Sequence, residues 1–327
     1  MAALIDHPAR GPVPELADLR RLRAGDLDPL LREEVAAWER ALSWDFSASA
    51  SLVRRFVDAQ ALNGFALMAR GTAVGYVYYI FEEHKGLIGD VYVGEGFRTV
   101  DNENRLLGAA VETLISTPFV RRVECQLMML AGDTGRAFPF PDRVSTFDRA
   151  FMVFDLAGTP VPPPGRAFPH ISIETWEERH QEAAAQVIAS AYSGHIDSQI
   201  NDQYHSVAGA RRFLANIVQF PGCGAFFQPA SCIAVDPETR RLQGISLTSL
   251  VAYDVGHITQ ICVAPSVRGR GVGYEVLRHS LEALRGRGCR KVGLTVTSAN
   301  RGAIRLYDSV GFHKLREFAA CVWEGFR

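Results

Sequence analysis

The pattern of apolar and polar positions predicts alternating helices and strands along the second half of the chain. Helices are expected where apolar residues recur every three or four positions, and strands where Val, Ile, Leu and Phe cluster between turn residues. The expected order is helix, helix, three strands, helix, strand, helix and strand, over residues 174–192, 208–218, 225–235, 242–251, 257–263, a helix ending near 285, 291–296, 301–309 and 318–323.

The first half of the chain shows a similar order of elements. Helices are expected over residues 15–40, with an interruption around 25–29, and over 52–60 and 104–116, and strands over 66–70, 74–81, 89–93 and 123–130. Around one strand the sequences of the two halves align without a gap. Asp90-Val91-Tyr92-Val93 aligns with Gln260-Ile261-Cys262-Val263, and Arg98 aligns with Arg268. Such internal similarity indicates that one structural unit occurs twice.

A proline-rich segment separates the two halves. Residues 158–170 contain five prolines, and such a run neither continues a helix nor joins a central strand. We therefore expect a first domain over residues 1–157, a linker over 158–170 and a second domain over 171–327.

Composition narrows the classes of function. Of the 327 residues, 47% are hydrophobic and 22% are charged, and the formal net charge is −1. This balance argues against the basic surface that nucleic-acid binding requires. The six cysteines show no metal-ligand spacing, and no apolar segment is long enough to cross a bilayer. We expect a cytoplasmic protein without a metal site, a nucleic-acid partner or a membrane partner.

The most informative segment is the glycine-rich turn at residues 268–274, which follows the strand 257–263. It contains Gly269, Gly271 and Gly273 and leads into a predicted helix. The first N–H groups of a helix lack intrahelical partners, and the helix dipole favours an anion there. Glycines let a ligand approach the backbone closely. The turn therefore predicts a phosphate-binding site.

Only the second half carries these glycines. The positions that match Gly271 and Gly273 are Asp101 and Glu103 in the first half. Two carboxylates close to a polyphosphate are repulsive. We therefore expect the second half alone to bind a phosphorylated cofactor.

Two familiar phosphate-binding motifs do not fit the turn. A dinucleotide fingerprint requires a third glycine where Tyr274 stands, and a P-loop requires a Gly-Lys-Ser or Gly-Lys-Thr ending, which is absent. The pattern Arg268-x-x-Gly271-x-Gly273 after a Val-x-Pro strand end instead resembles the pyrophosphate loop of the GCN5-related N-acetyltransferase (GNAT) superfamily. The stretch 294–300, followed by Ala303, Tyr307 and Gly311-Phe312, resembles that family's next strand and helix.

The resemblance implies an α/β fold with two GNAT-like domains, each a mixed, mostly antiparallel twisted sheet flanked by helices. It covers residues 256–312 by motif and 171–327 by the order of elements. Residues 15–157 resemble the family in topology and weak pattern, which implies that domain 1–157 is a degenerate GNAT-like copy without the phosphate-binding turn. It implies an enzyme that moves an acetyl group from acetyl-CoA to a primary amine by direct attack, through a tetrahedral intermediate. The acceptor would be a small-molecule amine or the amino group of a peptide, and we favour a small molecule.

The resemblance also implies roles for individual residues. The implied catalytic residues are Tyr307, which would protonate or hydrogen-bond the CoA thiolate, and Asn300, which would hold the cofactor near its amide arm. The implied cofactor-binding residues are Ile261, Cys262, Val263, Arg268, Gly269, Arg270, Gly271, Val272, Gly273, Tyr274, Asn300, Ala303 and Tyr307.

Structural alternatives exist for several of these residues. Asn300 and Gly311 fit the two ends of a helix as caps, and Tyr307 fits a packed aromatic. Cys262 invites a covalent intermediate, although a cysteine in an apolar strand is usually inert. Alternatives for the whole chain are a non-catalytic acyl-CoA sensor, and a scaffold whose first half binds a partner protein.

The general base is open on sequence alone. The strand 257–263 offers Thr259 and Gln260, and neither is basic. The candidates are a water chain and four side chains, which are His257, Asp254, His195 and Asp197.

Overall fold

The computed structural model of the protein describes residues 13–165, 171–220 and 222–326. The N-terminal twelve residues and the last five residues of the expected linker lie outside the described residues. The chain divides into two compact units. Unit 1 comprises residues 1–34, 50–144 and 323–327, and unit 2 comprises residues 35–49 and 145–322.

Unit 1 contains a five-stranded sheet in the order β1-β2-β3-β4-β5. Neighbouring strands from β1 to β4 are antiparallel, and β4 pairs with β5 in parallel. The apolar face of α3 is buried, as its helical spacing predicts. The elements of the first half are β1 (Glu15–Asp18), α1 (Ala24–Leu42), α2 (Ser47–Asp58), β2 (Asn63–Ala69), β3 (Thr72–Glu82), β4 (Lys85–Val93), α3 (Val100–Ser116) and β5 (Arg122–Gln126).

Unit 2 contains a sheet in the order β13-β6-β12-β11-β10-β9-β7, with β8 paired to β10. The strands β10 and β11 form an antiparallel hairpin, and β11 pairs with β12 in parallel. The elements are β6 (Val144–Asp155), β7 (Ser172–Thr175), α4 (Gln181–Tyr192), α5 (Ile196–Ile200), α6 (Val207–Gln219), β8 (Ala225–Phe226), β9 (Cys232–Val235), β10 (Leu242–Ala252), β11 (Val255–Val263), α7 (Val272–Arg287), β12 (Lys291–Thr297), α8 (Arg301–Val310) and β13 (His313–Trp323).

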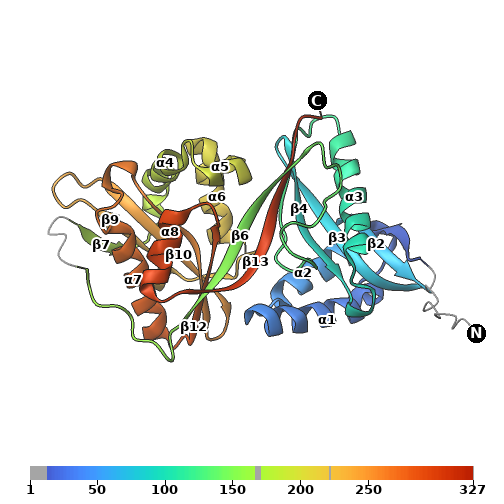
Figure 1. Ribbon diagram of the computed structural model, residues 1–327, viewed down its shortest axis with the longest axis horizontal. Coiled ribbons are helices and arrows are strands. Elements are labelled where there is room, and N and C mark those ends of the chain that lie inside the picture. Colours follow the sequence, from blue (N-terminus) through green and yellow to red (C-terminus); the bar gives the residue numbers. More distant parts are fainter. Residues whose placement is uncertain (1–12, 166–170, 221, 327) are drawn as a thin grey trace, which may run out of the picture. The chain divides into compact units, whose positions relative to one another are not determined.

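Helices cover both faces of the unit 2 sheet (Figure 1). Successive residues of a strand point to opposite faces. Along β9, Ile233 and Val235 therefore pack with α4 and α6, whereas Cys232 and Ala234 pack with the start of α7. A larger cluster joins α7 and α8 to β6 and β12. The sheet of unit 2 is thus a central layer between two helical layers.

The strand β6 was not predicted, and its residues were assigned to the first domain. Its second half pairs with the whole of β12, from Asp155↔Lys291 to Arg149↔Thr297, and residues 145–155 cluster with unit 2. Its residues 150–154 are all buried. A strand buried on both faces appears as a continuous apolar run without alternation, so its period gives no strand signal.

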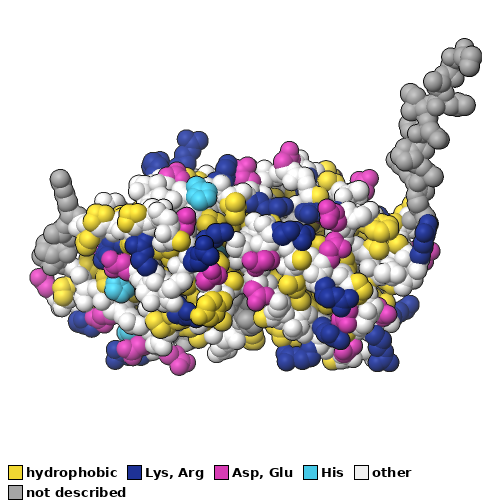
Figure 2. Space-filling view, turned by 90° about the horizontal axis from the view of Figure 1, so that it is seen from below, with side chains coloured by type: hydrophobic (Ala, Val, Ile, Leu, Met, Phe, Trp, Pro, Cys, Tyr) yellow, Lys and Arg dark blue, Asp and Glu magenta, His cyan; other side chains and the backbone are white. Residues whose placement is uncertain are grey.

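Charges of both signs are interspersed over the face of the molecule in Figure 2. This mixture agrees with the formal net charge of −1. None of the helices that the structure describes is both long enough and apolar enough to span a membrane.

The start of α6 packs tightly against the preceding 3-10 turn, Asp202–His205. Ser206 caps the helix by accepting a hydrogen bond from Gly209 N at 3.0 Å. A β-carbon added to Gly209 would lie 2.4 Å from the carbonyl oxygen of Gln203. Because the obstacle is backbone, only glycine fits at this position without moving the turn.

We expect Gly209→Ala to lower the free energy of unfolding by about 1–3 kcal/mol, because the new methyl group overpacks the turn. Gly286→Ala is the matched control, since a β-carbon there meets no atom within 4 Å. That change within α7 is expected to stabilise by about 0.4–1 kcal/mol. Urea unfolding of both variants measures the two effects, and equal stabilities would contradict the packing argument.

Candidate functional site

The strands β11 and β12 diverge halfway along their length. Their parallel pairing runs only from Val255↔Lys291 to Ile258↔Leu294, although β11 continues to Val263. A register shift against β10 at Thr259 marks the point of divergence. Beyond it, Ile261, Cys262 and Val263 pair with β10 alone among the described strands. Their second backbone edge is therefore available to an extended ligand.

The diverging strand leads to a helix start that no described side chain caps. Gly269 and Gly271 have φ angles of 73° and 86°, and Gly271 is the N-cap of α7. Residues 268–271 are exposed. The start of this 16-residue helix, with the positive end of its dipole, therefore lies directly after an exposed turn.

The glycine turn, β11 and α8 come together. A β-carbon added to Gly273 would lie 3.6 Å from Leu306 of α8 and 3.7 Å from Val263 of β11. Ile261, Tyr274 and Ala303 pack against the same cluster as Tyr307. The Arg268 guanidinium donates a hydrogen bond to the carbonyl oxygen of Ala191. The side chain of Arg270 is exposed, and that of Val272 is buried.

The corresponding helix start in unit 1 is filled by side chains. Thr99 caps α3 by accepting a hydrogen bond from Asn102 N at 3.2 Å. The Glu103 carboxylate, 2% exposed, accepts from Ala131 N at 2.9 Å and forms an ion pair with Arg136. The start of α3 is thus covered by side chains, whereas the start of α7 has no side-chain cap.

Unit 1 nevertheless repeats the strand divergence. The parallel pairing of β4 with β5 ends at Ile88↔Cys125, and a register shift against β3 falls at Gly89. Asp90 follows this bulge, as Gln260 follows the bulge in unit 2. Burial raises the pKa of Asp90, which accepts a hydrogen bond from the Tyr76 hydroxyl at 3.2 Å.

Asn300 and Gly311 delimit α8. The Asn300 side chain caps the helix by accepting a hydrogen bond from Ala303 N at 3.2 Å. Gly311 has a φ of 110° and donates from its N–H to the carbonyl oxygen of Tyr307 at 3.1 Å. Both residues therefore have the capping roles that sequence offered as an alternative to cofactor contact.

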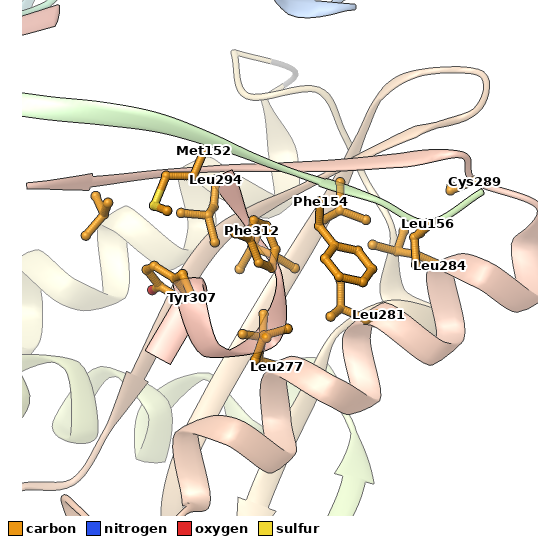
Figure 3. Packing of buried hydrophobic residues seen from close by; sticks show 14 of the residues in the cluster. Met152, Phe154, Leu156, Leu277, Leu281, Leu284, Cys289, Leu294, Tyr307 and Phe312 are labelled. Carbon is orange, nitrogen blue, oxygen red and sulfur yellow. The ribbon is translucent and has the colours of Figure 1, made fainter. Parts of the chain in front are cut away.

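Tyr307 lies at the edge of the cluster formed by α7, α8 and β12, and its hydroxyl points away from Phe312 (Figure 3). The residue is 6% exposed. Its hydroxyl has no hydrogen-bond partner among the described residues. Burial raises the pKa of Tyr307, and the nearby Asp197 raises it further. The phenol therefore stays protonated at neutral pH and is able to donate.

Gln260 is held by two tyrosines that sequence analysis did not identify as site residues. Its Nε2 donates to the Tyr192 hydroxyl at 3.2 Å, and its Oε1 accepts from the Tyr204 hydroxyl at 3.3 Å. The two rings stack with centroids 4.2 Å apart. No sequence signal linked them, because α4 and the turn before α6 are brought together only by folding.

Asp197 and Arg149 flank the end of β12. The Thr297 hydroxyl donates to Asp197 Oδ1, and Arg149 Nη2 donates to the Thr295 hydroxyl at 3.2 Å. Arg149 is the direct cross-strand partner of Thr297. Of these residues, only Asp197 was a sequence candidate. Arg149 was missed because β6 itself was not predicted.

Two base candidates and the covalent alternative find no support. His257 is 4% exposed, and burial lowers its pKa to about 4. Asp254 precedes β11, about 20 Å of extended strand from Gln260. Burial raises the pKa of Cys262 to about 12, so its thiol is protonated at neutral pH.

The sequence profile of the Acetyltransferase (GNAT) family matches residues 203–312. The mycothiol acetyltransferase of Thermomonospora curvata is 36% identical over 87 residues, which are 27% of this chain and 29% of that protein. The [Ribosomal protein bS18]-alanine N-acetyltransferase of Salmonella typhimurium is 34% identical over 74 residues, which are 23% of this chain and 49% of that protein. The chain thus spans less than half of the length of either relative.

Solved structures resemble the chain over nearly its full length. A GCN5-related N-acetyltransferase from Sphaerobacter thermophilus has a TM-score of 0.66 and 19% identity, and the match covers 96% of each chain. A tandem GNAT protein from the clavulanic acid biosynthesis pathway has a TM-score of 0.59 and 16% identity, over 95% of this chain and 98% of that chain. The predicted resemblance to the family and the predicted fold class are confirmed. Residues 203–312 match the Acetyltransferase (GNAT) family, and the chain as a whole resembles a tandem GNAT protein in its fold.

Proposed function

We propose that unit 2 transfers an acetyl group from acetyl-CoA to a primary amine. The observation that carries this proposal is the divergence of β11 from β12 directly before the uncapped start of α7. The open backbone edge of β11 is then followed directly along the chain by the uncapped start of α7. A ligand with amide groups and a pyrophosphate matches both.

The residues present fit such a ligand. A β-carbon at Gly273 would make only ordinary van der Waals contacts, at 3.6 and 3.7 Å, so packing within the protein does not require glycine there. A close approach by a phosphate does require it. Gly269 and Gly271 have left-handed φ angles that other residues adopt at a cost.

Backbone groups orient the thioester in this proposal. The open edge of Ile261, Cys262 and Val263 holds the extended arm, and N–H groups of residues 268–274 bind the pyrophosphate. Acetyl-CoA supplies the activated acetyl group when it is bound. Fixed N–H donors near the developing oxyanion account for much of the rate gain, because they need no reorganisation during the reaction.

Tyr307 donates a proton or a hydrogen bond to the leaving sulfur, and the proton that the amine nitrogen loses on acylation passes to solvent, from which the phenol is restored. Its raised pKa keeps the phenol protonated, which suits a donor. Asn300 already accepts a hydrogen bond from Ala303 N through Oδ1, so only its amide nitrogen is left to donate to the cofactor. Asn300 and Ala303 therefore belong to the binding site rather than to the proton transfer.

The acceptor is an amine in this proposal. The relative from Salmonella typhimurium is by name an alanine N-acetyltransferase that acts on a ribosomal protein, and the relative from Thermomonospora curvata is by name a mycothiol acetyltransferase. These names support an acceptor that is either a peptide amino group or a small molecule. Unit 1 lacks the uncapped helix start, so we assign it no cofactor.

We expect Gly273→Ala to weaken acetyl-CoA binding at least about tenfold, because the methyl group stands where the phosphate approaches. The same change adds a good helix former in the first turn of α7 and is not expected to lower thermal stability. Calorimetric titration with acetyl-CoA measures the affinity. Gly286→Ala, at the far end of α7, is the matched control, and an unchanged affinity in Gly273→Ala would contradict the site.

We expect Tyr307→Phe to lower kcat about 100-fold with little change in acetyl-CoA affinity, because a general acid contributes to the transition state. Tyr253→Phe is the matched control, since Tyr253 is 82% exposed in the turn before β11. Thiol release over a panel of amines measures the rate. Wild-type kcat in Tyr307→Phe would remove Tyr307 from the mechanism, whereas tight binding without transfer by the native protein would favour the acyl-CoA sensor.

A further inference from the structure

We propose that the acceptor is a primary amine that also carries a carboxylate or a phosphate, with its ammonium group on Asp197 and its anionic group on Arg149. This inference rests on the proposed acetyl transfer and specifies its substrate class. The two side chains come from α5 and β6, far apart in the sequence, and both contact the end of β12: Asp197 accepts from Thr297 and Arg149 donates to Thr295.

Asp197 presents a charged oxygen that is held in place. Thr297 donates to its Oδ1, and the backbone N–H of Asp197 donates to His195 Nδ1 at 3.2 Å. His195 Nδ1 also lies 3.5 Å from Asp197 Oδ2.

No lysine or arginine of the described residues lies within ion-pair distance of Asp197. Its side chain is 14% exposed, so solvent screening of its charge is reduced. An ammonium group of a substrate is the natural partner for such a carboxylate. Thr297 and the short helix α5 fix the position of the carboxylate before the substrate arrives.

Arg149 offers a positive charge on the same face of the sheet. It stands opposite Thr297 in the antiparallel pair of β6 and β12, and it bonds Thr295, two residues earlier on the same side. A guanidinium keeps its charge at all physiological pH values, and its planar fork matches a carboxylate or a phosphate.

Both charges act at the proposed reaction centre. Asp197 raises the pKa of Tyr307, and Arg149 lowers it. Asp197 also raises the pKa of Tyr204, and Arg149 lowers it. The Tyr204 hydroxyl donates a hydrogen bond to Gln260. The two charged side chains contact Thr297 and Thr295 at the end of β12, the strand that leads directly into α8, the helix of Tyr307.

This arrangement selects by charge. An amine without an anionic group gains binding free energy from Asp197 alone, and an acceptor with a second positive charge is repelled by Arg149. A molecule with an ammonium and an anion gains from both. The expected class is thus small zwitterionic amines, such as ω-amino acids and aminoalkyl phosphates.

The test compares amines in matched pairs with the full chain and acetyl-CoA. One pair is 4-aminobutyrate and butylamine, and the other is O-phosphoethanolamine and ethanolamine; the two pairs distinguish a carboxylate from a phosphate. We expect kcat/KM to be at least about tenfold higher for the anionic member of one pair. Arg149→Gln should reduce this ratio to about one, and Asp197→Asn should raise KM for both members.

Matched controls remove charges elsewhere. Arg287→Gln removes a positive charge at the exposed C-terminal end of α7. Asp254→Asn removes a negative charge just before β11, at the end of that strand that is far from Gln260. Neither should change the ratio. Thermal unfolding and acetyl-CoA titration of each variant identify any loss of fold or of cofactor binding.

The outcomes separate this inference from the proposed function. Acetylation of both members of each pair at equal kcat/KM, or an unchanged ratio in Arg149→Gln, overturns the zwitterion inference and leaves the acetyltransferase standing. Absence of acetyl-CoA binding overturns the proposed function instead. If acetyl-CoA binds and no amine reacts, equilibrium dialysis measures whether the complex of the protein with acetyl-CoA retains 4-aminobutyrate or O-phosphoethanolamine. If the complex retains neither amine, the zwitterion inference is overturned.

Discussion

The divergence of β11 from β12 is the constraint on which the candidate site depends. A strand within a sheet normally satisfies its N–H and C=O groups on both sides. Beyond Ile258, β11 pairs with β10 alone, so one edge of its backbone has no partner strand. The bulge at Thr259 turns the strand at this point, and the chain then enters the glycine turn. Backbone groups, rather than reactive side chains, therefore dominate the site.

The same divergence in unit 1 shows that strand topology alone does not leave the following helix start uncapped. A bulge at Gly89 and a short parallel pairing of β4 with β5 reproduce the local geometry. The start of α3, however, is capped by Thr99 and covered by the buried ion pair of Glu103 with Arg136. Removing a buried carboxylate from its partner is costly, so this helix end cannot be cleared easily for a ligand.

Folding also decides which polar side chains surround the open edge. Gln260 has no basic group, but its amide joins Tyr192 and Tyr204 into one hydrogen-bonded set. Asp197 is oriented by Thr297, and Arg149 reaches the same strand from β6. A segment that precedes the proline-rich run thus supplies a charge to the sheet of unit 2. The acceptor side of the site is therefore assembled from four separate stretches of chain.

The sequence by itself determined the features whose causes are local. The glycines at 269, 271 and 273 specify the turn, Asn300 and Gly311 specify the ends of α8, and Asp101 with Glu103 distinguishes the two halves, because each depends on a few neighbouring residues. Only the tertiary structure decided the place of β6 and the partners of Gln260, Asp197 and Glu103. The contacts of Glu103 with Ala131, of Asp197 with Thr297 and of Arg149 with Thr297 join residues 28, 100 and 148 positions apart, and strand register and burial bring them together without leaving a periodic signal in the sequence.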